Sequence, residues 1–234
     1  MEGDRAAPKG GGVGDGRLPV PRGWEASCSR AAPDAVVGGS PFVISGILLA
    51  GGASTRMGRP KGLLPYRGVP FLRAVAAALL AGGVEELVAV LNPTVPGLRE
   101  VLPADPRVRW VAAPTAPSGQ IASLRTGLRT LSSSSEAVLV ALVDQPAVRP
   151  ETVAALILAL RESGAPILLP IHQGRRGHPV CFARALYPEL LEAPEEEGAR
   201  AVVRRHRALL REVPVDDPGI HQDVDSPEDF ARLA

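Results

Sequence analysis

The chain has 234 residues, 45% of them hydrophobic, which is enough to bury one substantial core and predicts a single folded domain. Its formal net charge is +1 and only 3% of its residues are aromatic, so it lacks the basic surface and the stacking side chains typical of nucleic-acid-binding proteins. No apolar run approaches the roughly 18 residues of a membrane span, so no membrane partner is expected.

The N-terminal part of the sequence differs from the rest in amino-acid composition and in hydrophobic periodicity. Residues 1–41 are rich in Gly, Pro, Ala, Arg and Asp and show no sustained hydrophobic period, so we predict a disordered tail there and one domain over 42–234. The alternative is a start codon further along the chain. Because Cys28 and Cys181 match no metal or redox spacing, and the first residues lack the apolar segment of a secretory signal, we expect a cytoplasmic protein.

From residue 42 onward, short apolar runs alternate with segments of helical periodicity. We predict strands at 43–50, 86–91, 108–112, 137–143, 166–170 and 210–215, and a further strand that ends near 182. We predict helices near 70–81, 96–102, 120–131, 150–163, 184–192 and 198–208, and a terminal helix that starts at Ser226. Strands that are continuously apolar and lie between helices predict an α/β fold: a three-layer, mostly parallel, Rossmann-like sheet with helices on both faces.

The first predicted strand runs into a glycine-rich loop, 51–61, that carries the cations Arg56 and Lys61. Glycines let backbone N–H groups approach phosphate oxygens closely, and cations offset the phosphate charge. A Walker loop does not fit, because Arg59 and Pro60 separate the last glycine from the lysine, and the dinucleotide fingerprint is absent too. The alternative is a tight turn with solvated side chains. We interpret the loop as a polyphosphate site.

Two aspartates are candidates for a metal site near this loop. Asp144 directly follows the apolar strand 137–143, so it should lie at the sheet edge where ligands bind in open α/β sheets. Mg²⁺ prefers one or two carboxylates together with phosphate oxygens and water, although an Asp here could also cap the next helix. Asp223 is the second candidate, because a helix cap explains Ser226 and Asp229 but leaves Asp223 unexplained.

Four motifs occur along residues 43–234 in a recognisable order. They are Leu49-Ala50-Gly51-Gly52-x-Ser54-x-Arg56-Met57-Gly58-x-x-Lys61, Asp144-Gln145-Pro146, Gly174-Arg175-Arg176-Gly177-His178-Pro179 and Asp223-Val224-Asp225-Ser226-Pro227-Glu228-Asp229. Together they resemble the MobA-like nucleotidyltransferases, which have the nucleotide-diphospho-sugar transferase fold, and within them the molybdenum cofactor cytidylyltransferase branch. The resemblance implies transfer of a nucleoside monophosphate from Mg-NTP, with CTP favoured, to the phosphate of a molybdopterin-type cofactor, with release of pyrophosphate.

The resemblance also implies roles for individual residues. It implies nucleotide binding by Leu49, Ala50, Gly51, Gly52, Ser54, Arg56, Lys61 and Ser123. It implies that Arg56 and Lys61 are catalytic, and that Asp144 and Asp223 hold Mg²⁺. It implies substrate contacts by Gln145, Arg176, Gly177 and His178. The chemistry agrees, because a phosphate monoester is already an anionic nucleophile and needs positioning and charge neutralisation rather than an activated Ser, His or Cys.

Several alternatives remain open at the level of sequence. Leu49-Ala50-Gly51-Gly52 follows the guanylyltransferase pattern, whereas cytidylyltransferases usually have Leu-Ala-Ala-Gly, so GTP is the rival nucleotide. A different acceptor, such as a sugar or isoprenoid phosphate, is the rival substrate. A non-catalytic protein that carries the cofactor to a recipient molybdoenzyme is the rival of another class. A redox protein is disfavoured by the absent dinucleotide fingerprint.

Overall fold

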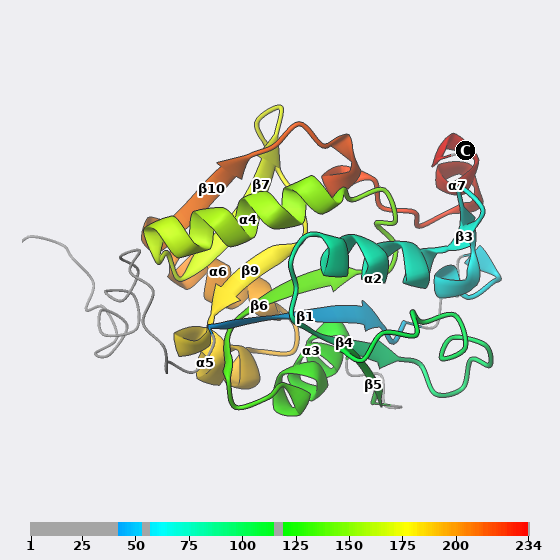
Figure 1. Cartoon of the computed structure of the whole chain (residues 1–234), viewed down its shortest axis with the longest axis horizontal. Helices are drawn as coiled ribbons and strands as arrows, with labels where there is room; N and C mark the ends of the chain where they lie inside the picture. The colour runs from blue at the N-terminus through cyan, green and yellow to red at the C-terminus, as the bar shows by residue number, and fades with distance from the viewer. Residues whose placement is uncertain (1–41, 53–56, 115–118, 234) are drawn as a thin grey trace, which may run out of the picture.

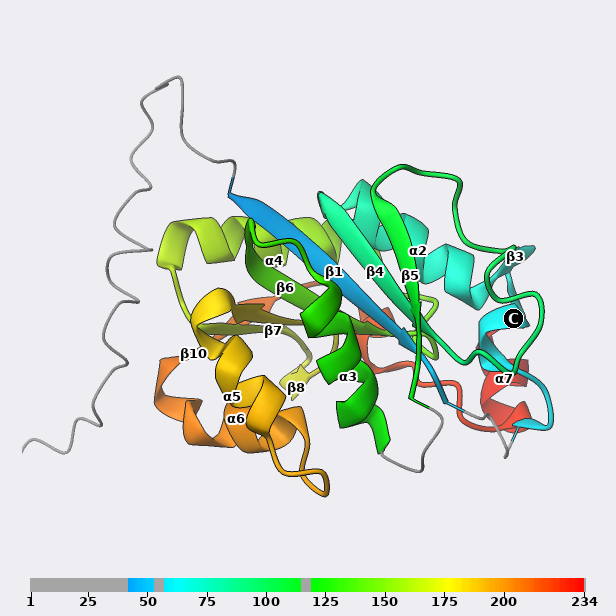
Figure 2. The same ribbon diagram turned by 90° about the horizontal axis from the view of Figure 1, so that it is seen from below.

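The computed structural model describes residues 42–52, 57–114 and 119–233; the tail predicted at 1–41 lies outside them. A mixed sheet with helices on both faces forms the body of the molecule (Figures 1 and 2). Its strands are β1 (Val43–Ala50), β4 (Glu86–Leu91), β5 (Val108–Ala112), β6 (Ser135–Leu142), β7 (Ile167–His172), β8 (Arg175–Arg176), β9 (Val180–Ala183) and β10 (Leu210–Pro214). The predicted three-layer α/β class is confirmed.

The strand order is β10-β7-β9-β6-β1-β4-β5, with β8 paired to β7. β6, β1, β4 and β5 are mutually parallel neighbours, and β10 is parallel to β7. β9 is antiparallel to both β6 and β7, so it joins the two parallel groups without reversing their direction. The carboxyl ends of β1, β4, β6 and β7 therefore share one edge of the sheet.

The helices cover the two faces of this sheet unequally. α2 (Phe71–Ala81) and α4 (Pro150–Ser163) lie on one face, and α3 (Gly119–Thr130), α5 (Tyr187–Glu192) and α6 (Ala199–Arg205) lie on the other (Figure 2). Successive strand side chains point to opposite faces, so Leu48 packs under α2 and α4 while its neighbour Ile47 packs under α3. Both side chains are fully buried, which is why the strand has apolar residues on both of its faces at these positions.

Element boundaries match the sequence prediction closely, with one error. Strands 43–50, 86–91 and 108–112 and the helix 150–163 have the predicted bounds. The helix predicted at 96–102 is wrong, because the segment forms turns instead. Gly97 has φ +85°, which a right-handed helix does not allow. No helix within the described ranges is long and apolar enough to cross a membrane.

A small third core attaches the C-terminal helix α7 (Pro227–Leu233) to the glycine-rich loop region. Met57, Leu64, Phe71 and Val224 form this core, and Phe230 packs against it with its ring centroid 6.0 Å from that of Phe71. The predicted helix cap is also confirmed: the backbone N–H of Asp229 donates to Ser226 Oγ (3.2 Å), and the Ser226 hydroxyl donates to the Asp229 carboxylate (2.8 Å). The C-terminal segment is therefore fixed next to η2 (Lys61–Leu63).

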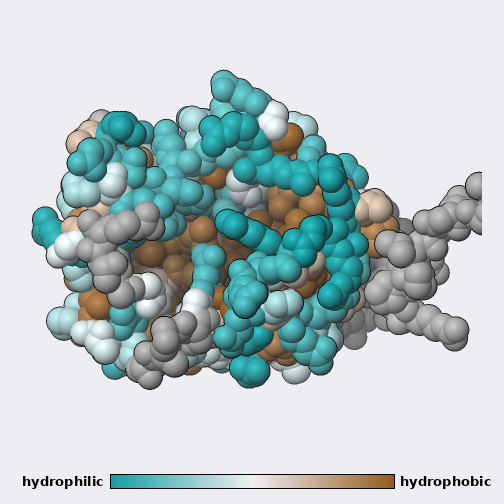
Figure 3. Space-filling view, turned by 180° about the vertical axis from the view of Figure 1, so that it is seen from behind, coloured by the Kyte–Doolittle hydropathy of each residue, from teal (hydrophilic) through white to brown (hydrophobic). Residues whose placement is uncertain are grey.

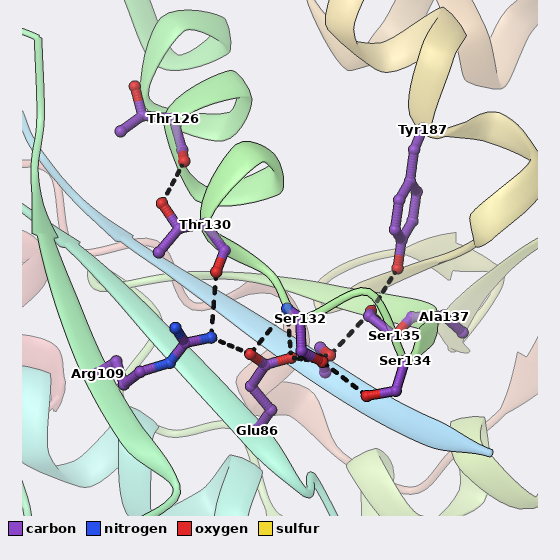
Figure 4. A network of polar contacts seen from close by, with 10 residues as sticks. Glu86, Arg109, Thr126, Thr130, Ser132, Ser134, Ser135, Ala137 and Tyr187 are labelled. Carbon is purple, nitrogen blue, oxygen red and sulfur yellow. Dashed lines mark hydrogen bonds and ion pairs between the residues drawn. The ribbon is translucent and has the colours of Figure 1, made fainter. Parts of the chain in front are cut away.

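A buried polar network ties strands and helices together at the opposite, amino-end edge of the sheet (Figure 4). Glu86, at the start of β4, accepts hydrogen bonds from the Ser45 hydroxyl (2.8 Å), the Ser132 backbone N–H (3.0 Å) and the Arg109 guanidinium. Arg109 also donates to the carbonyl of Thr130, the last residue of α3 (3.1 Å). Four serines thus hydrogen-bond to this carboxylate or to each other: Ser45, Ser132, Ser134 and Ser135.

Replacing Glu86 with Ala is expected to lower the free energy of unfolding by about 2–4 kcal/mol, because several buried donors lose their acceptor together. Chemical denaturation measures this loss. Glu85→Ala is the matched control: Glu85 is an exposed neighbour whose ion pair with Arg161 is long (3.8 Å), so a change below about 1 kcal/mol is expected. Equal losses in the two variants would show that the network contributes nothing beyond an ordinary surface carboxylate.

Candidate active site

The glycine-rich loop and Asp144 leave the sheet side by side. Leu49 of β1 is paired in register with Leu142 of β6, and the Val143 N–H donates to the Leu49 carbonyl (3.1 Å) just beyond the end of β6. Gly51 therefore follows β1 at the same edge where Asp144 follows β6. This is the arrangement that parallel neighbouring strands predict, since their carboxyl ends coincide. Ser54 and Arg56, the other predicted loop residues, lie outside the described residues.

Lys61 lies between two carboxylates at this edge. Its Nζ is 3.2 Å from Asp144 Oδ2 and 2.5 Å from Asp225 Oδ1. The lysine side chain is only 12% exposed, so its charge is poorly solvated and depends on these partners. Asp225 is not among the predicted site residues, although it lies only two residues beyond Asp223. The structure adds Asp225 to the cluster.

The electrostatic surroundings of Asp144 are unfavourable for its charge. Burial raises the pKa of Asp144, the negative charges of Asp223 and Asp225 raise it further, and the ammonium of Lys61 opposes both effects. Asp144 Oδ1 is buried and receives no hydrogen bond from any residue in the described ranges. A buried carboxylate oxygen with free lone pairs is a suitable ligand for a hard divalent cation. The chain therefore fits the metal that the sequence predicted.

No three His, Cys, Asp or Glu side chains in the described part of the chain converge as a complete metal-binding group. Mg²⁺ in nucleotide sites takes one or two carboxylates and completes its shell with phosphate oxygens and water. Asp144 and Asp223 are the carboxylates that the sequence predicts for that role. Their charges are close enough for Asp223 to raise the pKa of Asp144.

The segment that carries Asp223 is held against the end of β6 by three hydrogen bonds. The Val224 N–H donates to the Asp144 carbonyl (2.9 Å), and Gln145 Nε2 donates to Asp223 Oδ1 (2.5 Å) and to the Ile220 carbonyl (3.3 Å). Gln145 is only 3% exposed. Its Nε2 therefore faces the 220–223 segment and orients Asp223, while Gln145 Oε1 accepts no hydrogen bond from the described residues; the contact between Gln145 and substrate stays a prediction.

Gly51 and Ser123 face each other across a narrow gap on the predicted nucleotide side. A Cβ on Gly51 would lie 2.6 Å from the Ala113 Cβ and 2.8 Å from Ser123 Oγ, so only glycine fits between them. Ser123 belongs to α3 and is one of the residues that the resemblance implies for nucleotide binding. On the α3 side of the molecule, seen from behind, the surface is hollowed and hydrophobic residues show inside a hydrophilic rim (Figure 3).

The residues of the predicted substrate motif, 174–179, lie in two places: His178 is near the carboxylates Asp144 and Asp223, and Arg176 is on the surface of the sheet. The His178 N–H donates to the Ile220 carbonyl (3.3 Å), which holds His178 beside the 220–223 segment. Burial lowers the pKa of His178, while the charges of Asp223 and Asp144 oppose this shift, so the imidazole lies close to both carboxylates. Arg176 lies elsewhere: its Nε donates to the carboxylate of Glu212 on the edge strand β10 (2.6 Å).

The mixed, mostly parallel sheet, with the glycine-rich loop and the carboxylates at its carboxyl edge, has the nucleotide-diphospho-sugar transferase fold of the nucleotidyltransferases. The chain belongs to the MobA-like NTP transferase family, because the profile described as "MobA-like NTP transferase domain" matches residues 46–209. That match spans β1 through most of the sheet, and so includes the glycine-rich loop, Asp144 and His178.

Curated relatives extend over most of the chain. A protein named "Nicotine blue oxidoreductase" from Paenarthrobacter nicotinovorans is 32% identical over 202 residues, which cover 81% of this chain and 96% of the relative. A protein named "Probable molybdenum cofactor guanylyltransferase" from Trichormus variabilis is 30% identical over 197 residues, which cover 81% and 90%. The relatives therefore share the whole domain but carry names of two different activities.

A similar crystal structure is that of Rv0371c from Mycobacterium tuberculosis H37Rv. It is 30% identical, covers 82% of this chain and 97% of its own, and superposes with a TM-score of 0.72. A second structure of the same protein, described as a complex with manganese, superposes with a TM-score of 0.66 at 27% identity. A divalent cation has thus been observed with a protein of this fold.

Proposed function

We propose that the protein transfers a nucleoside monophosphate from Mg-NTP, with CTP as the favoured nucleotide, to the phosphate of a molybdopterin-type cofactor in the cytoplasm. The observation that carries this proposal is the buried Asp144 carboxylate beside the glycine-rich loop, with one oxygen that no described residue hydrogen-bonds. Family membership supports the reaction class. A molybdoenzyme that receives the product is the partner we expect.

The proposed reaction is a displacement at phosphorus. An oxygen of the acceptor phosphate bonds to the α-phosphorus, and the bond from that phosphorus to the oxygen bridging to the β-phosphate breaks, so pyrophosphate leaves with its electron pair. Mg²⁺ held by Asp144 and Asp223 would supply neutralisation of phosphate charge when bound. Arg56 and Lys61 would supply further positive charge, and Gly51, Gly52 and Ser123 would fix the nucleotide.

Residues on the acceptor side have a positioning task in this proposal. His178 lies near Asp144 and Asp223, and burial lowers its pKa, so a neutral imidazole there can donate or accept one hydrogen bond with substrate. Gly177 lets the chain pass close to Ile220. Arg176 would reach substrate only by leaving Glu212, which makes it the weakest of the proposed contacts.

GTP is the second candidate nucleotide, and the packing around Gly51 favours it. The Leu-Ala-Ala-Gly form usual in cytidylyltransferases would place a methyl group 2.6 Å from the Ala113 Cβ and 2.8 Å from Ser123 Oγ, so one of these side chains would have to move. The choice between CTP and GTP therefore depends on how Ala113, just after β5, and Ser123 of α3 surround this position, rather than on Gly51 alone.

Gly51→Ala is expected to raise KM for the nucleotide by about tenfold, because its methyl group pushes Ala113 and Ser123 out of place. Adding Ala113→Gly to the same chain removes the colliding methyl group and should restore most of the affinity. KM for CTP and for GTP, measured for the single and the double variant, tests this. If Gly51→Ala alone improved CTP use, the packing argument would be wrong.

The deciding assay for the proposed function is pyrophosphate release by the purified protein from CTP and from GTP, with Mg²⁺ and a molybdopterin-type cofactor. Release that depends on both nucleotide and cofactor supports the transferase. A nicotinamide- or dye-dependent activity with no pyrophosphate would favour the oxidoreductase name of one relative instead. Cofactor binding without turnover of any nucleotide would favour the non-catalytic carrier, and turnover with a sugar or isoprenoid phosphate would change the acceptor.

A further inference from the structure

Lys61 lies where its ammonium group affects the binding of a divalent cation to Asp144. Its ammonium lies 3.2 Å from Asp144 Oδ2 and 2.5 Å from Asp225 Oδ1, and its side chain is only 12% exposed. In this structure the Lys61 ammonium therefore pairs with carboxylates, although the proposed function requires it to contact the phosphates of the nucleotide. Both arrangements are accessible, because a lysine has a flexible four-carbon stem and a point charge without fixed geometry.

A divalent cation and this ammonium need the same carboxylate. Asp144 Oδ1 is buried and receives no hydrogen bond from the residues that the structure describes, while Oδ2 is bound by Lys61. The two oxygens of one carboxylate are about 2.2 Å apart, so a cation at Oδ1 lies within a few ångströms of the ammonium. In a partly buried site such like charges repel strongly.

We propose that Lys61 competes with the divalent cation for Asp144, so that metal binds well only when a nucleotide draws the ammonium toward its phosphates. This inference rests on the metal site of the proposed function. Asp225 tolerates the exchange, because its side chain is 42% exposed and water can solvate it once Lys61 has moved. Linkage requires that metal and nucleotide then increase each other's affinity.

The test is a titration of the full-length protein with Mn²⁺ in the absence of nucleotide. Calorimetry, or the electron paramagnetic resonance signal of free Mn²⁺, measures the binding. Lys61→Met removes the competing charge and is expected to tighten Mn²⁺ binding by about tenfold or more. Lys61→Gln, which keeps a hydrogen-bond donor for the carboxylates, should do the same and guards against a folding defect in the first variant. Arg161→Met is the matched control, because Arg161 lies on α4 and pairs with the exposed Glu85, so its loss should leave Mn²⁺ affinity unchanged.

A second measurement tests the coupling. The α,β-methylene analogues of CTP and GTP should raise Mn²⁺ affinity of the native protein by a larger factor than that of Lys61→Met. Equal Mn²⁺ affinity in the native protein and both Lys61 variants would overturn the competition, and so would weaker binding in the variants. Adding Asp144→Asn separates this failure from that of the metal site: Mn²⁺ binding that survives Asp144→Asn would overturn the site itself and the competition with it.

Discussion

Asp144→Asn is expected to lower the rate of pyrophosphate release from Mg-NTP by about a hundredfold to a thousandfold. Asparagine keeps the size of the side chain and one carbonyl oxygen, but it loses the negative charge that would hold Mg²⁺ at the end of β6. It also deprives Lys61 of a charged partner at 3.2 Å. The assay is initial-rate kinetics at saturating nucleotide and Mg²⁺, with both CTP and GTP.

The stability of the same variant distinguishes a functional role from a structural one. The pKa of Asp144 is raised, chiefly by burial, so the folded protein holds the proton more tightly than the unfolded chain does. The stability contributed by this group is therefore present at pH values below its unfolded pKa and is lost as the pH rises through the folded pKa. At neutral pH the charge opposes folding, so Asp144→Asn should leave Tm unchanged or raise it.

Asp105→Asn is the matched control for Asp144→Asn. Asp105 lies in the loop before β5, where hydrogen bonds from Arg107 lower its pKa to about 2, so its charge supports the fold instead of opposing it. The control should lose some stability and keep full activity, the reverse of what Asp144→Asn should do. A fully active Asp144→Asn protein would contradict the metal-dependent mechanism.

The sequence predicts most of the fold because its apolar runs are long and because Pro and Gly mark the ends of its helices. Strand 43–50 is buried on both faces and mostly apolar, as expected for a strand in the middle of a covered sheet. Helix 150–163 begins with Pro150 and ends before Gly164 at φ +58°, a left-handed conformation that favours glycine. The error at 96–102 arose because Leu98, Val101 and Leu102 have helical spacing, while Gly97 and Pro103 break the helix.

The site was predictable where it depends on strand ends and less so where it depends on side-chain pairing. The convergence of Asp144 with the glycine-rich loop follows from two parallel strands being neighbours. Which donor serves which acceptor does not follow from spacing: Gln145 turned inward to Asp223, and Arg176 turned to Glu212 across β7. Asp225 is not predicted, because it directly precedes Ser226, and the helix cap at Ser226 already explains the acidic residues around it.

Gly177→Ala is the second large effect we expect, on both stability and activity. Gly177 donates its N–H to the Pro170 carbonyl (3.0 Å), and a Cβ at this position would collide with the Ile220 carbonyl oxygen and lie 2.7 Å from the Ile220 Cβ. Ile220 is fully buried, so its backbone has little room to move. Such overpacking costs about 1–3 kcal/mol, which corresponds to a Tm lower by about 2–4 °C per kcal/mol.

Activity should fall with Gly177→Ala because the displaced backbone is the one that orients Asp223. The Ile220 carbonyl and the Asp223 carboxylate share Gln145 Nε2 as donor, so moving one disturbs the other. We expect kcat/KM to fall by about tenfold or more, in line with the effect of small displacements on a positioned group. Gly164→Ala is the control: it strains the end of α4 and lowers Tm but lies outside the site, so kcat/KM should not change. Native kcat/KM in a destabilised Gly177→Ala protein would show that Asp223 is positioned without this contact.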